Sequence, residues 1–336
     1  MDFIGTYDFR LFQELRSHRL FPRLRFGIVN DDARSYMQNS RERFELITFS
    51  LLDSHTTSSH FSNIRIDNYV YTREALSAAG RLLTPDGVMV VKFQVDKPFI
   101  AGRLMSHLAK HGSVKLEEAK ITTDDWPFFY QHAPGLPSSV ILISCVLILV
   151  CWQVMKKTAV PITGISWPFF FLGAGFMLME AQIVSRTALL FGTTWLVNAI
   201  TISGLLLLIV AANSLERAGI RLPSTAAYGG LLATIVIAYF VPTEALFSNS
   251  LAIKIGAAIL VWCSPVFFAS IIFIRAFAAA RFAGSALGSN LLGALAGGLI
   301  ESLSLWLGLR ALLLLAMLVY SVAFLLQRRV HAPAPA

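Results

Sequence analysis

Cysteine and charge are both scarce in this chain of 336 residues. The three cysteines, Cys145, Cys151 and Cys263, lie in apolar stretches and lack the spacing of metal ligands. The sequence therefore indicates neither a disulfide framework nor a cysteine-ligated metal site, and packing is their expected role. Charged residues make up only 14% of the chain, while hydrophobic residues make up 55% and the mean hydropathy is +0.63. Such a composition is far too apolar for a soluble globular protein.

The deficit of charge is confined to the second part of the chain. Residues 1–137 hold 17 Lys/Arg and 16 Asp/Glu, whereas residues 138–336 hold 11 and 4. We therefore expect a charge-balanced domain over 1–137 and an all-α polytopic membrane domain over 138–336. The net charge of +8 comes mostly from the second part, which favours basic loops at lipid headgroups over a nucleic-acid surface. The first ten residues lack the apolar core of a signal peptide.

Apolar stretches predict about seven transmembrane helices, most of them near the ~20 residues that cross a bilayer. Trp152, Trp167 and Tyr228 fall near their ends, as interfacial anchors do. The bilayer is thus the first expected partner, and a bacterial inner (plasma) membrane is the expected location. The segments are 139–155, 167–191, 194–213, 225–241, 251–274, 284–307 and 309–327.

Lys and Arg alternate along the loops between these segments. The loops after segments one, three, five and seven carry two basic residues each, while the opposite loops hold only Lys254 and Arg310. The positive-inside rule then places residues 1–137 outside the cytoplasm. A domain that uses a cytoplasmic nucleotide should lie on the other side, so the orientation stays open at this point.

Residues 44–93 have the pattern of a βαβ unit. Leu46–Phe49 and Val88–Phe93 are short apolar runs typical of buried parallel strands, and Thr72 is suited to begin a helix between them. Thr84-Pro85-Asp86-Gly87 predicts a tight turn before the second strand. We expect a partial parallel sheet of at least three strands, two of which are these runs side by side or nearly so. Arg25–Val29 is also typical of a strand.

Several short motifs resemble a known family. FELITFSLLDS, VYTREAL and LTPDGVMVV are similar, in this order, to the second half of the spermidine synthase (polyamine aminopropyltransferase) domain. The stretches DDWPF, FFFLGAGFMLMEAQIVSRTALLFG and GSNLLGALAGGL resemble its membrane-fused relatives. The resemblance implies an α/β, methyltransferase-like Rossmann domain.

The resemblance also implies roles for particular residues. Asp32, with Ala33, falls where the family contacts its nucleotide, which would be S-adenosylmethionine or its decarboxylated form. Asp53 matches the second carboxylate of the family's Asp-x-x-Asp loop, and Ser50 stands in place of the first. Asp53 would then position or deprotonate a small amine substrate, since transfer needs a neutral nitrogen.

Residues 1–27 carry no Gly-rich turn of the kind that opens a nucleotide-binding Rossmann half. We therefore expect only a partial Rossmann domain. Two functions stay open: a membrane-anchored aminopropyl- or methyl-transferase, and a non-enzymatic transporter-like or scaffolding membrane protein that carries a degenerate Rossmann remnant.

Polar residues inside the apolar segments form the last set of candidates. Glu180 lies near the middle of 167–191, and Asn290 and Glu301 share one face of 284–307 with a small-residue ridge of Ser289, Gly293 and Gly297. A carboxylate at this depth should face protein or water. Helix packing and a proton or cation site are both open roles. His55 and His60 lack zinc spacing, so no metal is expected.

The sequence DDWPFFY, residues 124–130, places two carboxylates beside an aromatic cluster. Such a cluster fits an interfacial seam at the lipid headgroups or a lid over an active site.

Overall fold

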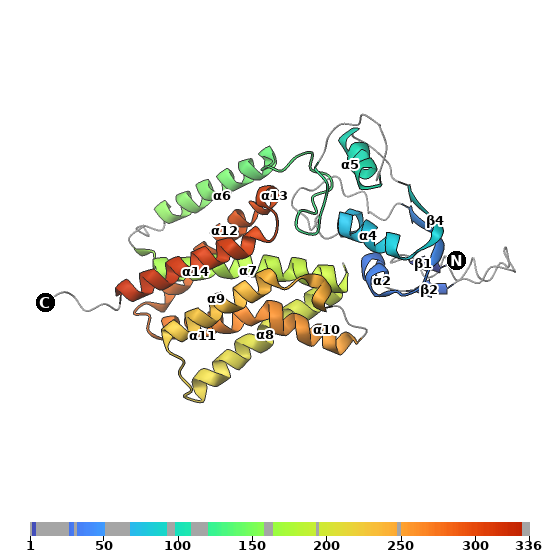
Figure 1. Ribbon diagram of the computed structural model, residues 1–336. Coiled ribbons are helices and arrows are strands. Elements are labelled where there is room, and N and C mark those ends of the chain that lie inside the picture. Colours follow the sequence, from blue (N-terminus) through green and yellow to red (C-terminus); the bar gives the residue numbers. More distant parts are fainter. Residues whose placement is uncertain are drawn as a thin grey trace, which may run out of the picture.

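The computed structural model describes residues 2–4, 27–29, 32–50, 68–92, 98–108, 120–157, 164–192, 195–246 and 250–330. The chain is mostly helical. A helical bundle carries at one of its ends the N-terminal part (residues 1–137), which contains all the strands among the described residues (Figure 1).

The strands form two separate parallel pairs. β1 pairs with β2, and β3 pairs with β4. The second pair confirms that the predicted strands Leu46–Phe49 and Val88–Phe93 lie side by side. Within the described ranges no sheet has the three strands that we expected. The elements of this part are β1 (Asp2–Ile4), β2 (Gly27–Val29), α2 (Ala33–Asn39), β3 (Phe44–Ser50), α4 (Arg73–Arg81), β4 (Leu83–Lys92) and α5 (Pro98–Leu108).

Helix α4 connects β3 to its parallel neighbour β4 and so completes the predicted βαβ unit. The Thr72 side chain accepts a hydrogen bond from the Ala75 amide at 3.3 Å, and Glu74 lies in the first turn, where the helix dipole favours a negative charge. Its apolar face, with Leu76, Ala79 and the following Leu82, is buried in a small core beneath the sheet.

The turn predicted at Thr84–Gly87 lies within β4: a Cβ on Gly87 would be 3.0 Å from the Thr84 amide nitrogen, so the backbone folds back between these two residues. These residues belong to β4, but Leu83 pairs with Phe44 while Val88 pairs with Leu46, so four residues lie opposite one and the strand bulges. A Cβ on Gly87 would lie 2.9 Å from the Phe44 carbonyl oxygen. Close approach of the backbone, and not a positive φ, therefore accounts for glycine here.

Helices occupy all seven predicted membrane segments. Six are long and apolar enough to span a membrane, and α9 is shorter, with 17 residues or about 25 Å of helix. A π-helical turn (Ile259–Cys263) joins α10 to α11 within one span. The helices are α6 (Ser138–Lys157), α7 (Trp167–Phe191), α8 (Trp195–Arg217), α9 (Ser224–Phe240), α10 (Leu251–Ala258), α11 (Ser264–Ala278), α12 (Ala283–Glu301), α13 (Ser304–Leu307) and α14 (Ala311–Val330).

Helix α7 is the most buried span of the bundle. It runs parallel to α12, because Ser166 bonds Ser289, Phe170 faces Gly293 and Ala174 faces Gly297. The predicted small-residue ridge thus lets the two backbones approach closely. By contrast, α6 exposes nearly all of its apolar side chains, as a lipid-facing helix does.

Asp125 and Trp126 connect the N-terminal part to the end of the bundle. The Asp125 carboxylate accepts a hydrogen bond from the Arg310 amide at 2.6 Å, and the Trp126 indole donates to the Leu305 carbonyl at 2.9 Å. Trp126 is only 2% exposed. It is therefore packed inside a protein seam and does not lie at the lipid headgroups, which corrects the interfacial interpretation of this segment.

Candidate functional site

The carboxyl end of β3 is where the resemblance places the catalytic pair. Ser50 is the last residue of β3 and pairs with Lys92 of β4. Asp53, like His55, His60 and Asp67, lies outside the described residues. The structure therefore shows where β3 ends, three residues before Asp53. The catalytic roles of Ser50 and Asp53 stay a prediction.

Asp32, the predicted nucleotide ligand, caps helix α2. Its Oδ1 accepts hydrogen bonds from the amides of Arg34 at 3.0 Å and Ser35 at 3.1 Å, the arrangement of an N-cap aspartate. The residue is 6% exposed, and its Cβ packs against Gly192, which follows α7 with a φ of +79°. Asp32 is thus enclosed between the start of α2 and the end of α7, and the neighbouring Ala33 is half-buried.

A buried ion pair begins two residues after Asp32. Arg34, 2% exposed, pairs with Asp124 and donates to the Tyr69 carbonyl and the Thr72 hydroxyl, each at 2.8 Å. The Thr72 hydroxyl lies 2.9 Å from Asp124. Burial raises the pKa of the Asp124 carboxyl above its ordinary value, although Arg34 acts against the shift. Asp124 therefore holds α2 and α4 together and does not cap an open cleft.

His107 of α5 is a second buried titratable group. The Thr122 hydroxyl donates to the Tyr71 carbonyl at 2.8 Å, so it accepts from His107 Nε2 at 2.9 Å, which identifies the neutral Nε2–H tautomer. Among the described residues Nδ1 has no partner. Burial, with Arg103 and Arg73 nearby, lowers the pKa of His107 to about 4. The ring is therefore neutral at physiological pH.

Arg103 organises the chain between α5 and α6. Its guanidinium is fully buried, donates to the carbonyls of Lys120 at 2.7 Å and Gln131 at 2.8 Å, and lies 5.4 Å from the Trp126 ring. Burial lowers its pKa to about 10, so it keeps its charge near neutral pH. Every hydrogen bond here goes to backbone, which indicates a structural role.

The intramembrane polar residues gather along the α7–α12 seam. Asn290 donates to the Phe169 carbonyl at 3.2 Å, across the seam. Glu180 and Glu301 are both half-buried and lie near enough to interact electrostatically. Asn290 thus has the packing role that the sequence left open, while the role of the two glutamates stays a prediction. In the described part of the chain, no three His, Cys, Asp or Glu side chains could hold a metal together.

Sequence reasoning missed two features of the structure. Arg34 and Arg103 are buried, although arginine is mostly exposed in proteins, so only their neighbours in space identify them. Tyr228, expected as an interfacial anchor, is 2% exposed and lines a cavity at the end of the bundle remote from the N-terminal part. Trp152 and Trp167 are 49% and 44% exposed, as anchors at segment ends should be.

No protein-family model, no curated protein and no solved structure matches this chain.

Proposed function

We propose that this chain is a non-enzymatic, transporter-like or scaffolding protein of a bacterial inner (plasma) membrane. In this proposal the N-terminal part is a Rossmann remnant that has become a structural unit docked on the bundle. The six membrane-length helices support the membrane role. The contacts of Asp125 and Trp126 with the end of the bundle support permanent docking.

The position of Asp32 carries the proposal. A carboxylate that accepts hydrogen bonds from a nucleotide must be accessible at the end of the strand that precedes it. Here Oδ1 already accepts two backbone amides, and the Cβ contacts Gly192 at the end of a transmembrane helix. A nucleotide would have to displace both the helix cap and a helix end before it could reach this side chain.

Calorimetry of the purified full chain tests the proposal. We expect no binding heat from S-adenosylmethionine, its decarboxylated form or methylthioadenosine. Asp32→Ala should lower the free energy of unfolding by about 1 kcal/mol, whereas Asp32→Asn, which keeps a capping oxygen, should change it little. Saturable binding of any of the three nucleotides that Asp32→Asn abolishes would reject the structural role and restore the nucleotide site.

One observation favours the transferase as a second candidate. β3 and β4 form the parallel pair that the resemblance requires, and Asp53 follows the carboxyl end of β3, where ligands of such sheets bind. In that case Asp53 would accept the proton of a small amine, and Ser50 would orient it. Turnover with an amine separates this candidate from the structural one.

A further inference from the structure

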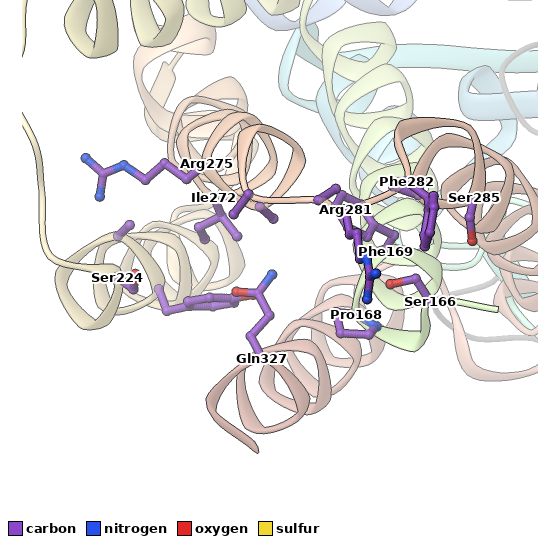
Figure 2. Close-up of a pocket in the computed structure, with 16 residues that line it drawn as sticks. Ser166, Pro168, Phe169, Ser224, Ile272, Arg275, Arg281, Phe282, Ser285 and Gln327 are labelled. Carbon is purple, nitrogen blue, oxygen red and sulfur yellow. The ribbon is translucent and has the colours of Figure 1, made fainter. Parts of the chain in front are cut away.

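A cavity of about 440 Å³ lies at the end of the bundle opposite the N-terminal part. This is within the usual size range of small-molecule sites. Figure 2 shows its lining, in which Gln327 of α14 and Arg281 extend into the space between the helices while Arg275 points away. The apolar part of the lining includes Phe169, Ile272 and Phe282, and the 16 lining residues include no carboxylate.

Three helices begin at this cavity. The first turns of α7, α9 and α12 contribute Pro168, Ser224 and Ser285 to its lining. None of the three helices has a side-chain hydrogen bond at its N-cap residue. The positive ends of three helix dipoles therefore converge where an anion could bind.

The arginines at the cavity differ in their partners. Arg275 is neutralised by Glu216, with its Nε 2.8 Å from the carboxylate, and also donates to the Leu222 carbonyl. Arg281 makes no ion pair among the described residues and stacks on the Phe282 ring at 5.5 Å. One uncompensated cation thus stands at the rim. The carbonyl ends of α11 and α14 also reach this end. Arg328 lies in the last turn of α14 and offsets the negative end of that helix dipole, whereas Arg275 in the last turn of α11 is already paired with Glu216.

A buried hydroxyl provides an independent sign of a ligand. Tyr228 lines the cavity and is 2% exposed, with its ring packed on Phe324 at 4.8 Å between centroids. Its hydroxyl has no hydrogen-bond partner among the described residues. A buried polar group of this kind is costly unless something bonds to it.

We propose that this cavity binds the phosphate group of an anionic amphiphile, with phosphatidylglycerol-type phospholipid as its source. The helix N-termini and Arg281 would hold the phosphate, and the phenyl and aliphatic side chains would contact the glycerol and the upper acyl chain. Basic pockets between transmembrane helices are suited to such headgroups. The inference rests on the cavity alone and is independent of the role of Asp32.

Native mass spectrometry of the full chain in detergent tests the proposal, with phosphatidylglycerol, zwitterionic phosphatidylcholine and glycerol 3-phosphate as probes. Arg281→Gln removes the uncompensated charge, and Tyr228→Phe removes only the hydroxyl. Arg221→Gln is the matched control, because it removes one exposed charge from the same end of the bundle but outside the lining.

We expect Arg281→Gln to weaken phosphatidylglycerol binding about tenfold and Tyr228→Phe about threefold, with Arg221→Gln unchanged. Phosphatidylcholine should bind more weakly to the wild type, and glycerol 3-phosphate should compete only in large excess. Equal losses of phosphatidylglycerol binding in Arg281→Gln and Arg221→Gln would show that only the overall surface charge matters, and would overturn the proposed site. Competition by glycerol 3-phosphate at lipid-like concentrations would reject the lipid and assign the site to a soluble phosphate ester.

Discussion

Replacing Gly293 with alanine should separate the two central helices of the bundle. A Cβ at this position would collide with the Phe170 carbonyl oxygen and would lie only 2.6 Å and 2.8 Å from the Phe170 carbonyl carbon and Cα. Carbon atoms in contact stay about 3.5–4.0 Å apart, so α7 and α12 must move apart by roughly 1 Å. All three atoms belong to backbone, so no side-chain rotation can relieve the overlap.

The same helix offers a matched control. A Cβ on Gly298 would meet nothing within 4 Å. Gly298→Ala should therefore be neutral or stabilise α12 by up to ~1 kcal/mol, since alanine is the better helix former. Gly293→Ala receives the same propensity gain but also overpacks the seam, which typically costs about 1–3 kcal/mol.

Unfolding of the full chain in mixed detergent–SDS micelles, followed by circular dichroism, measures the difference. We expect the midpoint of Gly293→Ala to fall below the wild type and that of Gly298→Ala to stay at or above it. If Gly293→Ala is as stable as Gly298→Ala, the close approach of α7 and α12 is wrong.

Three further outcomes are expected. His107→Gln should remove a pH dependence of stability: the folded pKa of about 4 lies below the ordinary 6.5, so the unfolded state binds more protons between these values. The free energy of unfolding of the wild type should thus fall as the pH falls from about 6.5 to about 4, by on the order of 2 kcal/mol after allowance for solvent screening. The same dependence on pH in His107→Gln would contradict this. Trp126→Phe should loosen the contact with Leu305 and speed proteolysis of the linker before α6, while unchanged cleavage would show that the indole bond does not hold the seam. If the chain is a transferase, Asp53→Asn should lose ~10²–10⁴ of its turnover with putrescine while Asp67→Asn changes little, and equal rates would refute the assignment.

The features that follow from local sequence were predicted well. Each of the seven predicted apolar segments is helical in the described residues, because a bilayer requires a continuous apolar run of helix. Thr72 was recognised as a helix cap, because the bond that it forms lies within three residues. The pairing of β3 with β4 followed from two apolar runs joined by one helix.

The features that depend on distant neighbours were not predicted. The bulge at Thr84–Gly87 is set by the register against β3, which the sequence of β4 alone does not contain. Trp126 and Tyr228 are of the residue types that anchor proteins at lipid headgroups, yet both are buried by other parts of the chain. The cavity forms where three helix starts converge, and these starts are separated by more than fifty residues of sequence.

The distribution of basic residues bears on how the two ends of the bundle are oriented in the membrane. Lys156, Arg217, Arg275 and Arg328 lie in the last turns of α6, α8, α11 and α14, at the end remote from the N-terminal part. The positive-inside rule predicts that this end faces the cytoplasm, and its surface would then meet the anionic leaflet from which the proposed phosphate ligand would come. The N-terminal part would lie outside, away from the cytoplasmic nucleotides that a transferase needs. A docked structural role for that part removes this conflict, because Asp32 then needs no nucleotide and packs against Gly192, which follows α7.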